Sequence, residues 1–204
     1  MAKTQAGLLS LGTTGKFAGS MVFVQGKAGT VIRQHVTPTN PKSQGQTGVR
    51  AMMAWASQQW AELTTVEKAT WKMAVAKAGE SPFNAFVRVC MNQWKNGLGG
   101  QSQYPTIIEA APAIPTTPTA TVTGRQVTIA WVDPAARVLG VAVHFDSAAI
   151  TTPGPGNAVA VEDDATQQSI IPALKPGTYH YRIRAFSAEG IFGPATTDAT
   201  FVIV

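Results

Sequence analysis

Few residues of this chain have the chemistry of a reactive site, and their spacing does not bring them together. The three histidines, His35, His144 and His180, lie in separate predicted strands without a sequence-adjacent carboxylate or cysteine at ligand spacing. Cys90 falls on a helical apolar stripe, where a small core residue is expected rather than a nucleophile. The run Glu162-Asp163-Asp164 lacks the further spaced oxygen ligands of a calcium loop. The sequence therefore predicts no enzyme and no metal or other cofactor.

The charge content is low and unevenly distributed. Charged residues make up 13% of the chain, which favours a surface largely covered by partners. Residues 1–104 hold eleven Lys/Arg and three acids, whereas residues 105–204 hold five Lys/Arg and eight acids. A basic half can face nucleic acid or an acidic protein surface. Its basic residues are scattered singly, which favours a protein partner.

The sequence also indicates a compartment. One cysteine cannot form an internal disulfide, and the first twenty residues lack the apolar core of a signal peptide. We therefore expect synthesis in a reducing cytoplasm. No apolar run approaches the roughly 20 residues that span a bilayer, so no membrane partner is expected.

Two helices and the corner between them are predicted within residues 40–79. The first carries one apolar stripe: Val49, Met52, Met53, Ala56, Trp60 and Leu63. Thr64 and Glu67 fit a capping box that starts the second helix. Its expected buried face is Trp71, Ala74, Val75 and Ala78, and Gly79 ends it.

A third helix is predicted from Ser81-Pro82, an N-cap followed by proline at the first helical position. Its stripe is Phe86, Val89, Cys90 and Trp94, and it ends near Asn96-Gly97. We expect the three helices to be structural, with Trp60, Leu63, Trp71 and Phe86 in their core.

The remaining segments complete an α+β chain of two domains. Residues 1–20 form a Gly/Ser/Thr-rich arm, and residues 21–25 and 30–36 form a hairpin that belongs with the helices in a docking module, 21–97. Residues 98–118 are a Gly/Pro-rich linker. Seven short alternating runs in residues 119–204 predict an antiparallel β-sandwich with its own core. The expected strands are 119–123, 126–132, 138–145, 158–161, 168–171, 179–186 and 197–204.

The predicted sandwich has Trp131 in its second strand and the run LKPGTYHYRIRA from Leu174 to Ala185. These residues give it a resemblance to a fibronectin type III domain, an immunoglobulin-like fold. The resemblance implies that Trp131 and Tyr179 are core residues and that Tyr179 hydrogen-bonds backwards to form a tyrosine corner. The fold alone says almost nothing about function.

The N-terminal part contains a series of short motifs: Asn40-Pro41-Lys42-Ser43-Gln44-Gly45-Gln46, Arg50, Trp60-Ala61-Glu62-Leu63-Thr64 with Trp71, and Asn84-Ala85-Phe86. In these motifs it is similar to a family of tailed-bacteriophage proteins. The resemblance implies a structural protein of the virion, made in the bacterial host cytoplasm and present in several copies. Its partners would be major capsid, neck or tail subunits, and a small anchor with a sandwich behind it suits decoration of the capsid exterior.

The N-terminal arm is expected to be held by a neighbouring subunit. Its large apolar residues are too few to offset an ordering cost of about 1–2 kcal/mol per residue. The alternative is that it packs on its own domain. The expected assembly contacts are Lys3, Leu8, Leu9, Leu11, Lys16, Phe17, Lys27 and Arg33.

Two other functions are compatible with parts of the sequence. The spacing from Trp60 to Trp71 also resembles the last helical corner of an HMG box, a DNA-binding domain. Only five basic residues lie between Asn40 and Gly79, too few on one face for the usual 6–10 phosphates. The sandwich could instead bind carbohydrate at a cell surface, although no aromatic platform is evident from sequence.

Overall fold

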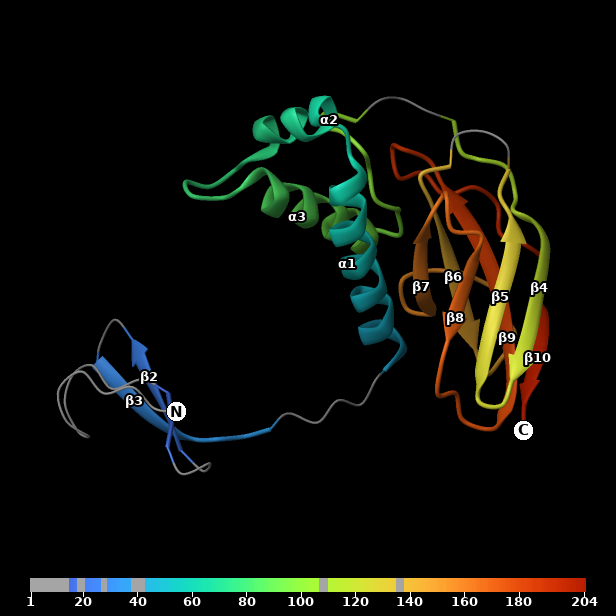
Figure 1. Cartoon of the computed structure of the whole chain (residues 1–204), viewed down its shortest axis with the longest axis horizontal. Helices are drawn as coiled ribbons and strands as arrows, with labels where there is room; N and C mark the ends of the chain where they lie inside the picture. The colour runs from blue at the N-terminus through green and yellow to red at the C-terminus, as the bar shows by residue number, and fades with distance from the viewer. Residues whose placement is uncertain (1–14, 18–20, 27–28, 38–42, 107–109, 135–137) are drawn as a thin grey trace. The chain divides into compact units, whose positions relative to one another are not determined.

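The computed structural model describes residues 15–17, 21–26, 29–37, 43–106, 110–134 and 138–204. The chain divides into two compact units, residues 1–41 and residues 42–204. The expected α+β class is confirmed, because the elements comprise three α-helices, one 3-10 turn and ten strands among the described residues (Figure 1).

The first unit contains a small antiparallel sheet. Its strands are β1 (Gly15–Phe17), β2 (Met21–Gly26) and β3 (Gly29–Gln34), in the order β1-β2-β3. β2 and β3 pair from Met21↔Gln34 to Gly26↔Gly29, which confirms the expected hairpin. We call this pair of strands the ribbon.

The second unit contains the three expected helices, and the second and third of them begin at their predicted caps. They are α1 (Gln44–Glu62), α2 (Thr65–Thr70), the 3-10 turn η1 (Trp71–Ala74) and α3 (Pro82–Lys95). Thr64 and Glu67 form the expected capping box, in which the Thr64 backbone N–H donates to Glu67 Oε2 at 2.8 Å. The Ser81 hydroxyl oxygen accepts from the Asn84 backbone N–H at 3.2 Å, and α3 ends at Asn96 as expected.

The buried face of α1 differs from the predicted stripe. Its buried residues are Gly48, Met52, Trp55, Ala56 and Gln59, whereas Val49 and Met53 are exposed and Trp60 is half-buried. Gly48 explains the rotation. A Cβ there would collide with the Pro155 carbonyl oxygen and lie 3.2 Å from that of Ala158. The glycine lets α1 lie directly on the backbone, so the face that contains it is the face that is buried.

The second helix is shorter than predicted. It tightens into η1 and ends at Ala74, leaving Val75 half-buried and Ala78 exposed. Arg88 of α3 donates to the Ala74 carbonyl oxygen at 2.7 Å and pairs with Glu80 at 2.9 Å, which satisfies one free carbonyl at that end. Gly79 has the expected positive φ, 81°, but lies in the following turn.

All seven expected strands of the sandwich are present. They are β4 (Thr116–Thr123), β5 (Gln126–Val132), β6 (Gly140–Asp146), β7 (Ala158–Asp163), β8 (Gln168–Ile171), β9 (Gly177–Phe186) and β10 (Ala199–Ile203). They form a four-stranded sheet, β10-β9-β6-β7, and a three-stranded sheet, β4-β5-β8. Trp131 lies buried in the core between them, with Ile129, Val143 and Ile183.

The tyrosine corner is also present. Tyr179 Oη donates to the Lys175 carbonyl oxygen at 3.0 Å, four residues back in the chain. The ring is half-buried and stacks on Phe201 with its centroid 5.5 Å away. This hydrogen bond fixes the entry of β9 into its sheet.

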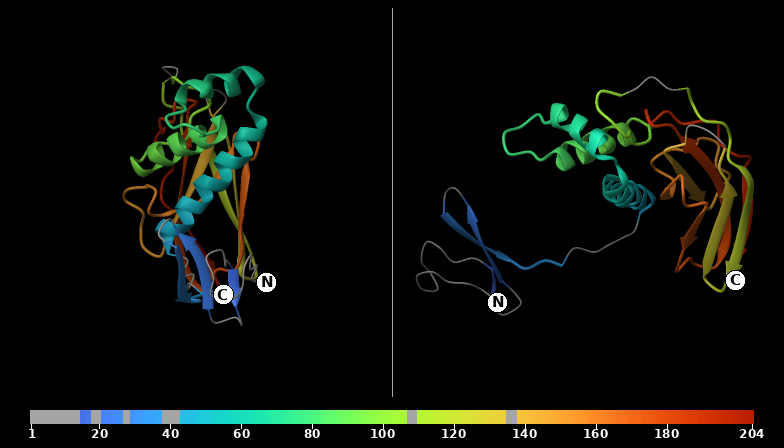
Figure 2. Two further views of the ribbon diagram at one scale, coloured as in Figure 1. Left: turned by 90° about the vertical axis from the view of Figure 1, so that its left-hand side faces the viewer. Right: turned by 45° about the horizontal axis from the view of Figure 1, so that its top comes forward.

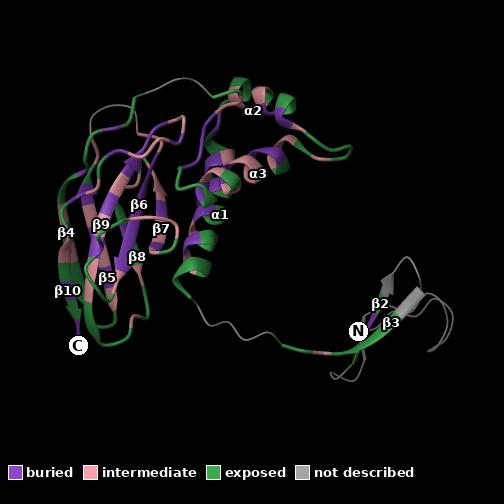
Figure 3. Ribbon diagram, turned by 180° about the vertical axis from the view of Figure 1, so that it is seen from behind, coloured by how far each residue is buried: buried purple, intermediate pink, exposed green. Residues whose placement is uncertain are grey.

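The helices and the sandwich share a core, which changes the expected domain division. α1 lies against β7 and α3 packs on α1, so all three helices gather on one side of the sandwich (Figure 2). Met52, Trp55 and Trp94 belong to one buried cluster with sandwich residues Ala142, Ala158, Val161 and Phe186. β6 is consequently buried on both faces (Figure 3). The hairpin falls in the first unit, and the helices expected beside it belong to the second unit with the sandwich.

The close approach at Gly48 gives a stability prediction with a matched control on the same helix. Gly48→Ala should destabilise the second unit by about 1–3 kcal/mol, because the atoms in the way are backbone carbonyls that cannot rotate aside. In Gly45→Ala nothing lies within 4 Å of the new Cβ, so this variant should raise the free energy of unfolding by about 0.5 kcal/mol. Urea unfolding of the two variants measures both values, and equal midpoints would contradict the packing of α1.

Candidate assembly interface

The ribbon carries apolar side chains on both of its faces. Side chains alternate between faces along a strand, and directly paired residues share one face. Phe23 pairs with Ile32 on one face, and Val24 pairs with Val31 on the other. A ribbon with one solvent face would show polar residues at every second position. Both faces of this ribbon are therefore suited to contact with other protein.

Most of the apolar side chains described on the ribbon are exposed. Val31 is 60% exposed and Ile32 is 49% exposed, and Met21, Val24 and Val36 are exposed as well. Among the side chains described in the first unit, residues 21–24 and 31–37, Phe23 alone is buried. A sheet this small is marginally stable in water without further packing. The ribbon is thus an exposed apolar surface with little packing of its own among the described residues.

The charges of the first unit all have one sign. Residues 1–41 contain Lys3, Lys16, Lys27 and Arg33 and no aspartate or glutamate. Arg33 is exposed and shares a face with Val24 and Val31, since it pairs with Val22. The ribbon therefore offers apolar contact together with positive charge, which suits an acidic protein surface.

The expected contact residues of the arm are only partly described. Lys3, Leu8, Leu9, Leu11 and Lys27 lie outside the described residues. Lys16 and Phe17 belong to β1, where they pair with Val22 and Met21 of the ribbon. The exposed residues Met21, Val24, Val31 and Ile32 were missing from the expected set. The uninterrupted apolar run Met21–Val24 carried that signal, because a strand without alternation is apolar on both faces.

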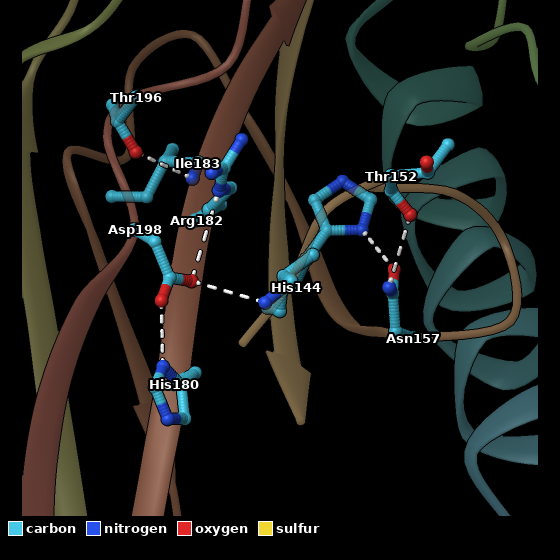
Figure 4. Close-up of polar contacts among 9 residues, drawn as sticks. His144, Thr152, Asn157, His180, Arg182, Ile183, Thr196 and Asp198 are labelled. Atoms are coloured by element: carbon cyan, nitrogen blue, oxygen red, sulfur yellow. Dashed lines mark hydrogen bonds and ion pairs between the residues drawn. The ribbon is translucent and has the colours of Figure 1, made fainter. Parts of the chain in front are cut away.

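Two of the histidines lie in polar clusters of the four-stranded sheet (Figure 4). His180 Nδ1 lies 2.6 Å from Asp198 Oδ2, and the Arg182 guanidinium lies 3.7 Å from the other oxygen of that carboxylate. Asp198 also accepts from the Ile150 backbone N–H at 3.2 Å. Sequence spacing could not show the histidine–carboxylate pair, because His180 on β9 and Asp198 just before β10 are 18 residues apart. The Asp198 carboxylate thus ties the backbone at Ile150 to the end of β10, at the edge of the sheet.

His144 is buried on the helix-facing side of β6. Its Nδ1 lies 3.0 Å from Asn157 Oδ1 and 3.2 Å from the Gly154 carbonyl oxygen, while its Nε2 is buried without a hydrogen-bond partner. Two acceptors at Nδ1 fit a neutral ring protonated there. Burial, together with the nearby Arg184 guanidinium, lowers the pKa of His144 to about 4, although the hydrogen bonds to Asn157 and Gly154 act in the opposite direction.

The buried imidazole predicts a pH dependence of stability. Between pH 6.5 and about 4 the unfolded chain protonates His144 and the folded chain does not, so stability falls as the pH falls through that window. The slope should approach about 1.4 kcal/mol per pH unit. We expect His144→Gln to lose this part of the slope, as measured by urea unfolding at pH 7, 6 and 5. An unchanged slope in the variant would contradict a neutral buried ring.

The remaining reactive residues lie in structural settings. Burial raises the pKa of the Cys90 thiol to about 12, so it stays protonated and unreactive at neutral pH. Glu162 accepts from the Ser169 hydroxyl at 2.7 Å, and Asp163 accepts from the Thr166 backbone N–H at 2.7 Å. Within the described part of the chain, no group of three or more His, Cys, Asp or Glu side chains could hold a metal ion.

A cavity of about 600 Å³ lies between the start of α1 and one end of the sandwich. Gln44 and Thr47 of α1 line one side, and Phe145, Leu174 and Tyr179 line the other. Asp146 and Lys175 add charged groups at its wall. The mixture of aromatic and polar groups is suited to a small polar ligand.

Comparison with known proteins identifies no family. No family model matches the chain, and no curated protein matches it. Similar solved structures include the chicken CNTN1 FN1-FN3 domains, at 20% identity and a TM-score of 0.39 over 46% of this chain and 33% of that one. The Clostridium perfringens spore cortex lytic enzyme SleM matches at 15% identity and a TM-score of 0.37 over 50% of this chain and 31% of that one. A myokine structure matches at 17% identity and a TM-score of 0.37, over 46% of this chain and 98% of that one.

The chain thus spans about a third of the first two proteins. Similarities at this level carry no functional inference, and the sandwich rests on its own strand pairing. Among the described residues, no helix is both long and apolar enough to cross a membrane.

Proposed function

We propose that this chain is a structural component of a bacteriophage virion that attaches through residues 1–41. The observation that carries the proposal is the ribbon, which exposes Val24 and Val31 on one face and Ile32 on the other, and which belongs to a unit whose charged residues are all basic. The motif resemblance in residues 40–86 supplies the virion setting. In this proposal the ribbon inserts between neighbouring virion subunits, which cover one face each.

The second unit is the part that the particle presents. Its helices are packed into the same core as the sandwich, so residues 42–204 act as one body. Attachment therefore belongs to the ribbon and arm, in place of the larger module of hairpin plus helices that the sequence suggested. We assign the sandwich to the fibronectin type III arrangement, supported by its three-on-four sheets and by the tyrosine corner. Decoration of the capsid exterior suits such a body.

Several contacts disfavour the DNA-binding alternative. An HMG box inserts apolar side chains into the minor groove and surrounds them with basic residues. Here Trp71 is fully buried and its indole N–H donates to the Ser102 carbonyl oxygen at 3.0 Å. Leu63 is buried too, and the half-buried Trp60 packs against Phe86 of α3. The apolar residues of the helical corner are occupied in the core.

Carbohydrate binding remains a second candidate function, favoured by the cavity beside α1. The half-buried ring of Tyr179 provides aromatic surface, while Gln44, Asp146 and Lys175 provide hydrogen-bonding groups. Glycans extracted from the host cell surface, titrated against the purified chain, test this candidate. Binding that is lost in Asp146→Asn would support it, and the absence of binding to any fraction would exclude it.

The attachment proposal is tested by placing a carboxylate on each face of the ribbon in turn. Val31→Asp and Ile32→Asp alter opposite faces at exposed positions. Insertion between two subunits buries both faces, and a buried unpaired charge is strongly unfavourable. We therefore expect the amount of each variant in particles to fall at least about tenfold. Val202→Asp, at an exposed position of β10, is the matched control and should incorporate normally.

The readout is the copy number of the chain per purified particle when each variant is the sole copy supplied. Thermal melting shows that each variant is folded. Loss in one face variant alone would limit docking to that face and contradict insertion between two subunits. Normal copy number in both variants would contradict attachment through the ribbon.

A further inference from the structure

The exposed side chains of the ribbon would suit a partner whose surface is acidic. The exposed residues Val31, Ile32 and Arg33 combine apolar and positive groups, and residues 1–41 hold four Lys/Arg without an acid. The second unit of this same chain carries a surface of the opposite character. That surface is built from three elements distant in sequence.

Five of the chain's eleven acidic residues gather there. Glu62 ends α1, Asp133 follows β5, and Glu162, Asp163 and Asp164 lie at the end of β7. Burial and then repulsion from Asp163 and Asp164 raise the pKa of Glu62. Burial and the same two carboxylates raise the pKa of Asp133 against a hydrogen bond from Trp131. The contacts between these elements agree: α1 lies against β7, the Trp131 backbone N–H donates to the Gln167 carbonyl oxygen at 3.1 Å, and Asp163 accepts from the Thr166 backbone N–H at 2.7 Å. The ends of α1, β5 and β7 therefore lie close together, and we call their five acidic residues the acidic patch.

The charge of the acidic patch is not neutralised within the described residues. Among the described residues, no lysine or arginine forms an ion pair with any of its five carboxylates. Glu62 and Asp164 are exposed, and Asp133 Oδ2 is buried without a hydrogen-bond partner. Repulsion among the carboxylates is a cost that a docked basic group would relieve.

Exposed apolar residues adjoin the acidic patch. Val132, 48% exposed, directly precedes Asp133, and Val66, 77% exposed, lies four residues beyond Glu62. The patch and its neighbours thus offer negative charge with apolar contact, the complement of the ribbon. Mixed surfaces of this kind dock through apolar burial while the charges set register and orientation.

We propose that the ribbon of one copy docks against the acidic patch of a second copy of this chain. The proposal rests on the attachment role of residues 1–41 and names one of the two subunits that flank the ribbon. The two surfaces are different parts of the chain, so the contact is heterologous and repeats from copy to copy. Copies joined in this way form a ring, or an open row along the particle.

The test is the mass of the purified full-length protein by sedimentation velocity, over a range of concentrations at low and high salt. We expect the mean mass to rise with concentration and to fall with salt. Asp164→Lys should weaken association at least about tenfold, because it replaces attraction by repulsion. Asp146→Lys, at the other end of the neighbouring strand β6, makes the same charge change and should associate normally.

Charge exchange tests the pairing itself. Arg33→Glu alone should weaken association, and the double variant Arg33→Glu/Asp164→Lys should recover much of it. A monomer at every concentration would overturn the proposal, as would equal effects of the two lysine variants. A monomer whose ribbon variants still fail to enter particles would leave the attachment role standing with a different partner. If the ribbon variants enter particles normally, both the attachment role of residues 1–41 and the docking between copies are contradicted.

Discussion

Replacing Trp55 by alanine is expected to lower the free energy of unfolding of the second unit by about 3–5 kcal/mol. Trp55 is fully buried where α1 meets the sandwich, and its ring lies edge-on to Phe186, with centroids 5.2 Å apart. The backbone of Gly100 packs against the ring so closely that a Cβ there would collide with it. The cavity left by alanine is enclosed by two parts of the fold and cannot readily collapse.

Trp55→Phe is the matched control for this prediction. The Trp55 indole N–H has no hydrogen-bond partner, so phenylalanine removes part of the volume without breaking a hydrogen bond. We expect it to cost much less than alanine in urea unfolding. Trp60→Ala should also cost less than Trp55→Ala, because Trp60 is only half-buried. If Trp55→Ala unfolds at the same midpoint as the parent, α1 does not share a core with the sandwich.

The isolated sandwich, residues 117–204, is expected not to fold cooperatively, whereas residues 43–204 should fold as one unit. Removing the helices uncovers Ala142, Ala158, Val161 and Phe186 in a single apolar surface. It also removes the Gly99 N–H that donates to the Gly190 carbonyl oxygen at 2.7 Å. The sandwich has the core between its sheets that the sequence suggested, but the other face of β6 belongs to a second core shared with the helices, and the shorter fragment loses that second core.

Circular dichroism and NMR spectra of the two fragments measure this difference. The longer fragment should give dispersed resonances and one cooperative melt, and the shorter one should show neither. A dispersed spectrum and a cooperative melt for residues 117–204 alone would contradict the shared core. The longer fragment controls for the absence of residues 1–41.

Local features of the fold could be predicted well from the sequence. The capping box at Thr64, the Ser81 cap, strands β5 and β8 and the Tyr179 corner were all expected. Each depends on residues within a few positions of one another, where side-chain chemistry and backbone geometry are directly linked. The sequence contains the whole of that information locally.

Contacts between distant elements were not predicted, for a physical reason. Gly48 and Gly100 decide how α1 and its Trp55 side chain pack, but a glycine adds nothing to an apolar pattern. The run Val141-Ala142-Val143 did carry a signal, since a strand without polar alternation is covered on both faces. The ribbon showed the same pattern at Met21–Val24. In both places the apolar run indicated a second layer without identifying it.

The central claim is that residues 1–41 attach the chain to the particle, and deletion tests it most directly. Residues 2–37 are removed, the remainder is shown to melt like the second unit within the full chain, and the copy number per purified particle is measured against full-length protein. The account predicts a folded protein that is lost from particles. Normal copy number of the truncated protein would contradict it and would assign attachment to residues 42–204.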